Sequence, residues 1–121
     1  MRAWSHLPNA AHIDAILADV QARPEVWDAG WYALIGPALD TAWDAAWRRA
    51  LDAGRVVAWG AARVNYRAAW DAIRALIAWD ESAALLDLTP DALRTIISTC
   101  DGDVKHQAVL LLPAVIARSA P

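Results

Sequence analysis

RVVAWGAARVNYRAAWDAIRALIAWDESAALLDL, the stretch at residues 55–88, carries helical periodicity for longer than any other segment of the chain. Its apolar residues recur at the spacing of one buried helix face, and they are Trp59, Tyr66, Trp70, Ile73 and Ile77. We therefore predict one long central helix over residues 55–88. Another side of this helix is mostly charged and is predicted to face water; it carries Arg63, Val64, Arg67, Asp71, Arg74, Ala78 and Glu81.

Two polar residues, Asn65 and Asp80, break this pattern, because both project toward the apolar half of an unbroken helix. A buried Asp80 is costly unless it is paired, so a buried polar network with Asn65 or an arginine is the leading interpretation. A helix break at residues 79–81 that exposes Asp80 is the second, and a functional carboxylate is the third. Asp80 and Glu81 would point about 100° apart, so they cannot act together as a carboxylate pair.

The remaining segments also predict helices, and no stretch alternates for long enough with the period of two that a strand requires. Asn9 is placed to cap a first helix that ends near residue 22, and Thr89 is placed to cap another over residues 90–99. Pro113 removes one internal hydrogen bond from the last helix and predicts a kink or a break there. With further helices over residues 24–35 and 37–53, these patterns indicate an all-α bundle of about six helices.

The composition is typical of one small domain. A chain of 121 residues, 58% of them hydrophobic, can bury a core without disulfides or metal ions. We expect a single helical domain over residues 1–121, in which residues 1–8 are a loosely ordered lead with Trp4 and Leu7 available to pack onto the body. The net charge is −3, so the chain lacks the excess of basic residues that binds the phosphates of a nucleic acid. A nucleic acid is therefore not expected as a partner.

Hydropathy predicts a protein that does not enter a membrane. No stretch reaches the roughly 20 apolar residues that span a bilayer, and residues 1–14 lack the apolar core of a secretory signal. A lone cysteine, Cys100, favours a reducing, cytoplasmic location. The longest apolar run, AVLLLPAVIA at residues 108–117, is interpreted as a buried helix. The alternative is a surface for a partner or for a second copy of the chain.

Residue patterns of catalytic and metal sites do not occur in this sequence. His6, His12 and His106 form no HxxxH or HExxH spacing, and the sequence contains no glycine-rich phosphate loop and no GxSxG motif. Cys100 ends an apolar face and is interpreted as a small buried hydrophobe, with a nucleophile as the alternative. No metal, cofactor or catalytic residue is therefore predicted.

Trp-Asp dipeptides begin at positions 27, 43, 70 and 79, and two of them extend to WDAxW. In such a unit the two indoles lie one helical turn apart on the buried side, with the aspartate beside them at the boundary. The tracts at residues 42–50 and 68–83 resemble the AWDAAW tracts of alanine-rich helical proteins from high-GC bacteria and their phages. Some chains of this style resemble proposed immunity proteins of toxin systems, and this resemblance carries over no catalytic residue.

The chain has eight tryptophans, more than a core of this size needs, and the functional hypotheses are based on them. The leading hypothesis is a non-catalytic protein–protein interaction module, such as an immunity or antitoxin-like inhibitor whose acidic surface meets a basic partner. Trp4, Trp27 and Trp31 are its candidate contacts, because tryptophan is enriched at interface hot spots. The alternative is a binder of a small aromatic or apolar ligand in a tryptophan-lined pocket. An enzyme that uses Asp80 is the third hypothesis, and self-association is compatible with each.

Overall fold

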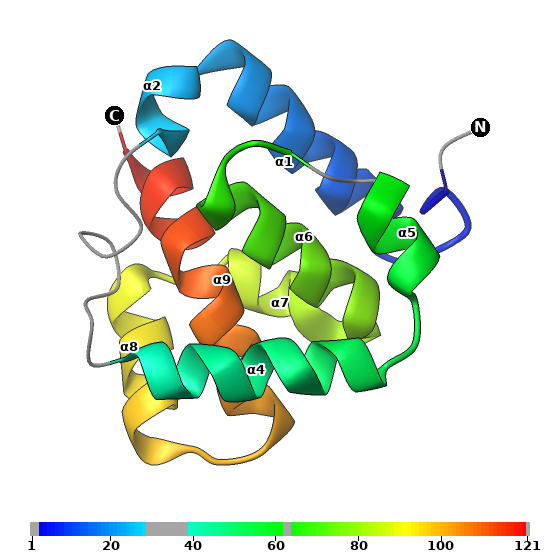
Figure 1. Ribbon diagram of the computed structural model, residues 1–121. Helices are drawn as coiled ribbons and strands as arrows, with labels where there is room; N and C mark the ends of the chain where they lie inside the picture. Colours follow the sequence, from blue (N-terminus) through cyan, green and yellow to red (C-terminus); the bar gives the residue numbers. More distant parts are fainter. Residues whose placement is uncertain (1–2, 29–38, 62–63, 121) are drawn as a thin grey trace.

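The computed structural model describes residues 3–28, 39–61 and 64–120, and every regular element within them is helical, so the predicted all-α class is confirmed (Figure 1). Among these described helices, none is both long and apolar enough to cross a membrane. In chain order the elements are α1 (Ala10–Ala22), α2 (Pro24–Trp27), α4 (Asp40–Asp52), α5 (Val56–Ala61), α6 (Arg67–Ala78), the 3-10 helix η2 (Asp80–Ser82), α7 (Ala83–Leu86), α8 (Pro90–Thr99) and α9 (Asp103–Ser119).

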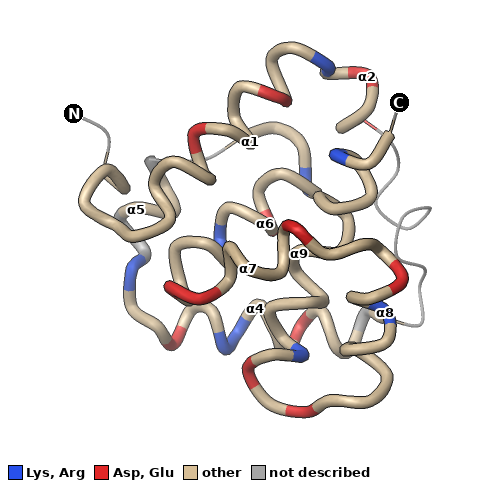
Figure 2. The backbone as a smooth tube through the Cα atoms, turned by 180° about the vertical axis from the view of Figure 1, so that it is seen from behind, with Lys and Arg blue, Asp and Glu red and all other residues tan. Residues whose placement is uncertain are grey.

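Helix α9 lies at the centre of the bundle, where α2, α4, α6, α7 and α8 contact it (Figure 1). Its residues 107–115 are buried without interruption, and its charged positions lie near its two ends (Figure 2). The apolar run at 108–117 is thus a buried helix, as predicted, and the chain itself covers it. Self-association through this run would need it to be exposed. Helix α9 continues through Pro113, so of the kink or break predicted there the break does not occur. Helices packed around α9 hold it in place despite the missing hydrogen bond.

The predicted long helix over residues 55–88 is wrong. This stretch consists of α5, α6, η2 and α7, and residues 64–66 and Trp79 are not helical. Helix α6 is buried around most of its circumference, including Asp71 and Arg74 on its charged side, because α1, α4, α5 and α9 all contact it. Of the three charged residues on this side of α6, Asp71 and Arg74 are buried and Arg67 is exposed, so the charged periodicity did not mark a continuous solvent face.

Tertiary hydrogen bonds hold the C-terminal end of α6 where the predicted helix breaks. The Asn9 side-chain amide donates to the carbonyl oxygens of Leu76, at 2.9 Å, and of Trp79, at 3.0 Å. The Arg55 guanidinium donates to the carbonyl oxygen of Ile77 at 2.8 Å. The last carbonyls of a helix lack intrahelical partners, so these donors stabilise the break. Asn9 occupies the N-cap position of α1, as predicted, but its side chain makes no cap hydrogen bond there.

Other helix boundaries follow the local sequence signals. The Thr89 hydroxyl accepts the Ala92 backbone N–H at 3.1 Å and caps α8, as predicted. The described part of the predicted lead, residues 3–8, forms turns that bury Trp4 and Leu7 against the core. Trp4 and Leu7 of the expected lead thus pack onto the body of the protein, as their sequence positions allowed.

Candidate functional site

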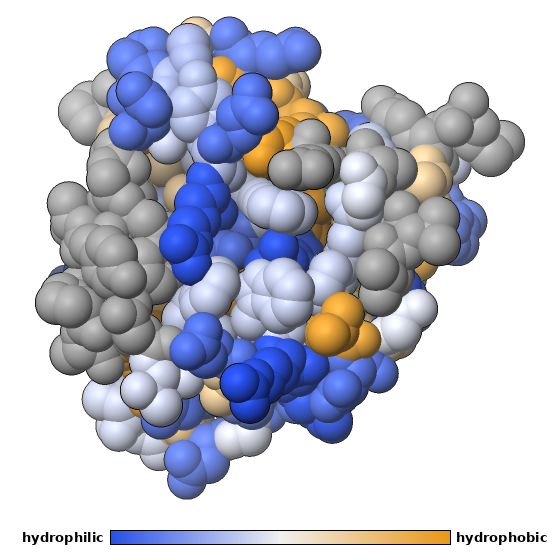
Figure 3. Space-filling model, in the orientation of Figure 1, coloured by the Kyte–Doolittle hydropathy of each residue, from blue (hydrophilic) through white to orange (hydrophobic). Residues whose placement is uncertain are grey.

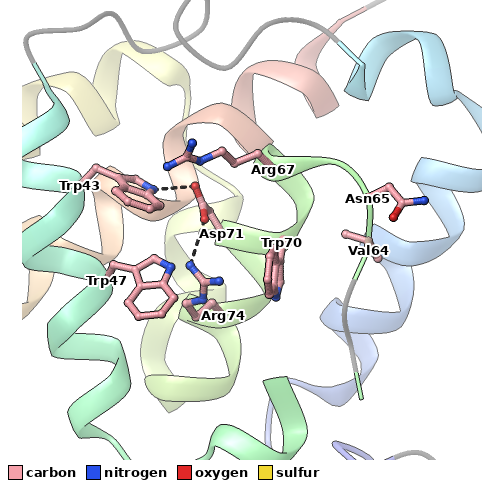
Figure 4. Close-up of a pocket in the computed structure, with 8 residues that line it drawn as sticks. All are labelled: Trp43, Trp47, Val64, Asn65, Arg67, Trp70, Asp71 and Arg74. Atoms are coloured by element: carbon pink, nitrogen blue, oxygen red, sulfur yellow. Dashed lines mark hydrogen bonds and ion pairs between the residues drawn. The ribbon is translucent and has the colours of Figure 1, made fainter. Parts of the chain in front are cut away.

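A recess with a volume of about 450 Å³ separates α4 from α6, and aromatic and charged side chains line it (Figure 4). Helix α4 contributes two tryptophans of a WDAxW unit, and α6 and the residues before it contribute the rest. The lining residues are Trp43, Trp47, Val64, Asn65, Arg67, Trp70, Asp71 and Arg74. In Figure 3, strongly hydrophilic surface reaches between pale residues near the centre of this face of the molecule.

The floor of this recess holds a buried ion pair. The Asp71 and Arg74 side chains are each 2% exposed, and Arg74 Nη1 lies 3.3 Å from Asp71 Oδ1. The Trp43 indole N–H donates to Asp71 Oδ2 at 2.7 Å and so connects α4 to α6 through the carboxylate. The i, i+3 spacing of Asp71 and Arg74 brings them to one face of α6, and the indole supplies a second partner for the carboxylate.

Indoles from three helices surround the Arg74 guanidinium. Its central carbon lies 4.3 Å from the ring centroid of Trp47 on α4, 5.0 Å from that of Trp59 on α5 and 4.6 Å from that of Trp70 on α6. Trp47 and Trp59 meet edge to face, with centroids 5.6 Å apart. Guanidinium–indole contacts of this kind stabilise a buried cation. The arrangement is an aromatic cage whose occupant is a side chain of the protein.

Arg67 places a second guanidinium at the recess. Its central carbon lies 4.1 Å from the ring centroid of Trp43, on the α4 wall. Figure 4 shows the Asp71 carboxylate between the guanidinium groups of Arg67 and Arg74. Arg67 is exposed, whereas Arg74 is buried, so one cation is at the rim and the other at the floor.

Burial acts on the ionisation of the pair at the floor. Removal from water raises the pKa of Asp71, against the opposing effects of the Trp43 hydrogen bond and of Arg74 and Arg67. The same removal from water lowers the pKa of Arg74, and Asp71 partly offsets this effect. Both shifts have the direction expected of charges that the fold holds in a medium of low polarity.

The buried polar network predicted at Asn65 and Asp80 is wrong, because both residues are exposed. Asn65 lies in the non-helical segment before α6 and lines the recess. Asp80 begins η2, where its side chain is 51% exposed and accepts a hydrogen bond from Arg55 at 2.7 Å. The second interpretation, a helix break near residue 79 that exposes Asp80, is the one confirmed.

The tryptophans expected to contact a partner lie mostly in the core. Trp4 is 6% exposed and donates to Asp14 at 3.0 Å, and Trp27 is 1% exposed and donates to Asp19 at 2.8 Å. Neither indole is placed as a surface anchor. Trp31 lies outside the described residues.

The other residues singled out from the sequence do not come together. Cys100 is half-buried at the end of α8, and its sulfur lies 3.8 Å from the Thr99 hydroxyl. His6 is exposed, while His12 and His106 are partly buried. Among the residues that the structure describes, no group of three or more His, Cys, Asp or Glu side chains could hold a metal ion.

Sequence reasoning missed the pair at the centre of the recess, although its parts were visible. Arg67, Asp71 and Arg74 follow one another at steps of four and three, so they share a helix face with alternating charge. The indoles of Trp43 and Trp47 lie one turn apart with centroids 6.4 Å apart, as the WDAxW unit predicts. A charged helix face and a pair of indoles can pack against each other. The contact between them joins two different helices, however, and the spacing of residues along one helix does not predict which helix will lie opposite.

Comparisons of the chain with protein-family models, with curated proteins and with solved structures gave no match, so the interpretation of the recess rests on its own chemistry.

Proposed function

We propose that this protein binds a small molecule with a flat aromatic body in the recess between α4 and α6. The observation that carries the proposal is the lining of that recess, in which Trp43, Trp47 and Trp70 border a volume of about 450 Å³. Small-molecule sites are typically concave, of roughly 300–1,000 Å³, and combine aromatic walls with a few placed polar groups. Indole walls favour a flat ligand because offset stacking adds to the burial of apolar area.

A larger recess, of about 610 Å³, lies between α4 and the ends of α8 and α9. Of the described residues that line it, His106 is the only one with an aromatic ring, and the others are aliphatic, small, polar or charged, such as Leu39, Ile97 and Lys105. Among its described lining residues, none of the charged side chains is buried. The recess at Trp43 and Trp47 therefore combines more of the features that distinguish a ligand site from an irregular surface.

The protein-interaction hypothesis, including an immunity-like inhibitor with a basic partner, stays a prediction. Two of its expected anchors, Trp4 and Trp27, are buried, and the third, Trp31, lies outside the described residues. The recess lined by Trp43, Trp47 and Trp70 supports the alternative, a binder of a small aromatic or apolar ligand. No reaction is proposed for this site.

Calorimetric titration with naphthylmethanol, a neutral two-ring probe, tests the proposal. We expect saturable binding at one site, and we expect Trp47→Leu to weaken it by about tenfold because one wall is lost. Trp4→Leu is the matched control, since Trp4 does not line the recess, and its affinity should stay within about twofold of the parent. Absence of binding to the parent protein, or an equal loss in both variants, would refute the proposed site.

A further inference from the structure

The Arg74 guanidinium at the floor of the recess has hydrogen-bonding capacity that the protein does not use. An arginine side chain offers five N–H donors. Within the described part of the chain, Arg74 makes one side-chain hydrogen bond, from Nη1 to Asp71 Oδ1 at 3.3 Å, and its Nε is buried without an acceptor. That distance is long for a charged pair, in which about 2.7–2.9 Å is usual. The guanidinium is therefore short of good acceptors.

The indoles around Arg74 do not supply what it lacks. Trp47, Trp59 and Trp70 surround the guanidinium and stabilise its charge, but an indole nitrogen only donates and the ring carries no oxygen. A buried donor without an acceptor costs free energy. Arg74 lines the recess, and Figure 4 shows its guanidinium between the rings of Trp47 and Trp70. An oxygen that a ligand brings to this place would lower the cost.

The chemistry of the floor favours an uncharged acceptor. A ligand carboxylate at Arg74 would lie close to the Asp71 carboxylate, which already accepts from the same guanidinium, and like charges repel strongly away from water. Burial already raises the pKa of Asp71, so the floor disfavours a negative charge. An ammonium group has no electron pair with which to accept a hydrogen bond. A carbonyl oxygen accepts two hydrogen bonds and brings no net charge.

We propose that the ligand is a neutral heteroaromatic molecule with a ring carbonyl, whose oxygen accepts a hydrogen bond from Arg74 while its ring packs against the indoles of α4 and α6. A ring carbonyl lies in the plane of its ring, so a stacked ring can present this oxygen at its edge. Arg74 is then the residue that determines specificity, because a ligand without the oxygen leaves its donors unpaired. This inference rests on the proposed function, because it names the class of ligand for the same recess.

Three two-ring probes test the proposal by calorimetry: N-methylquinolone, which is neutral and carries a ring carbonyl; methylnaphthalene, a hydrocarbon of similar shape; and the anion naphthoate. We expect N-methylquinolone to bind about tenfold more tightly than methylnaphthalene, because it adds a hydrogen bond to a charged donor. Naphthoate should bind more weakly than N-methylquinolone, because its charge loses water and meets Asp71.

Arg74→Lys supplies the variant, since it keeps a cation beside Asp71 and loses the Nε–H and the planar fork. It should reduce the preference for N-methylquinolone over methylnaphthalene by about fivefold, mostly through weaker binding of the quinolone. Arg94→Lys is the matched control, because Arg94 lies on α8 and does not line the recess. Its preference should stay within about twofold of the parent. Circular dichroism verifies that both variants fold.

A second measurement on the parent protein does not depend on a variant. With ¹⁵N-labelled arginine, the guanidinium N–H resonances of Arg74 should move downfield when N-methylquinolone binds, as expected of protons that gain a hydrogen bond, and much less when methylnaphthalene binds. The resonances of Arg94 should not move with either probe.

The outcomes separate the two proposals. Equal affinity for N-methylquinolone and methylnaphthalene, or an unchanged Arg74 resonance in the quinolone complex, would overturn the carbonyl acceptor and leave an aromatic site. Tighter binding of naphthoate than of N-methylquinolone would overturn the neutral ligand. If neither these probes nor naphthylmethanol binds, the proposed function itself fails.

Discussion

Helices α6 and α9 pack against each other at the centre of the bundle, yet different chemistry buries each of them. Helix α9 buries an uncharged stretch, residues 107–115, in which leucine and valine supply the bulk. Helix α6 buries alanines and isoleucines together with the ion pair Asp71–Arg74. The burial of α9 follows from the transfer of apolar area out of water. The burial of α6 requires in addition that two charges find partners, so it depends on α4 and α5 as much as on α6 itself.

The difference between α6 and α9 shows when a pattern of apolar and charged residues predicts burial correctly. A continuous apolar run predicts burial because exposure of such a run would be unfavourable in any fold. A charged stripe predicts exposure only when no partner can cover it. Arginine is the cation that indoles and a carboxylate can cover most readily, because its guanidinium is flat, weakly hydrated and rich in donors. Both cations on the charged side of α6, Arg67 and Arg74, are arginines.

The largest expected effect is that of Arg74→Ala in α6. The substitution leaves the Asp71 carboxylate buried without its cation and empties the space between three indoles. We expect the free energy of unfolding to fall by about 3–5 kcal/mol, measured by urea denaturation followed by circular dichroism. Arg94→Ala, at a site whose side chain is 52% exposed, should change it by less than about 0.5 kcal/mol.

A double variant decides whether the loss comes from the missing cation or from the missing volume. Asp71→Asn combined with Arg74→Met removes both charges and keeps most of the volume. It should recover about half of the loss or more, because a buried ion pair often stabilises no better than apolar groups of similar size. A double variant as unstable as Arg74→Ala would show that packing against the indoles, and not the uncompensated charge, dominates.

Leu111→Ala is the matching test in α9. The side chain is fully buried, so the substitution should cost about 2–5 kcal/mol from lost apolar transfer and from the cavity left behind. The same denaturation measurement applies. Its cost should not change with pH, since no titratable group changes its environment. A cost below about 1 kcal/mol would mean that the residues around Leu111 close the cavity, which contradicts tight packing at the centre of the bundle.

Asn9→Ala tests how the end of α6 is held. The two carbonyl oxygens that accept from Asn9 would lose their donor, and we expect a loss of about 1–3 kcal/mol. Hydrogen exchange should quicken most at the Trp79 amide, which donates to Ala75 in the last turn of α6. Gln21→Ala, at an exposed position on α1, is the control. An equal loss of protection throughout α9 would indicate global rather than local loosening.

Asp19 is a carboxylate at the edge of the bundle, and its replacement is expected to have the smallest effect on the free energy of unfolding. Its oxygens accept from Arg23 at 2.9 and 2.8 Å and from Trp27 at 2.8 Å. The Arg23 hydrogen bond lowers the pKa of Asp19 below its ordinary value of 3.8. Because the folded pKa is the lower one, the stability that Asp19 contributes is present above 3.8 and is lost as the pH falls through the folded value.

Asp19→Asn should therefore lower the free energy of unfolding by about 1 kcal/mol at neutral pH, a value reduced by partial exposure of the pair. The difference between variant and parent should shrink as the pH falls below the ordinary carboxyl range. Asp71 has a raised pKa, so its contribution should change with pH in the opposite sense. A difference at Asp19 that stays constant down to strongly acid pH would contradict the assigned shift.

The sequence by itself determined the helical class, the buried run in α9 and several helix ends. Each depends on neighbours along the chain: apolar spacing and length for α9, and the Thr89 cap for α8. Only the tertiary structure decided the break after Ala78 and the burial of Asp71 and Arg74. In both places, groups distant in sequence supply the partners: Asn9 for the carbonyls at the end of α6, and the indoles of Trp43, Trp47 and Trp59 for the charged pair. A local sequence pattern reflects the conformation that a segment prefers in water. Partners from other helices replace that water, and they lower the free-energy cost of burying a charge or of ending a helix.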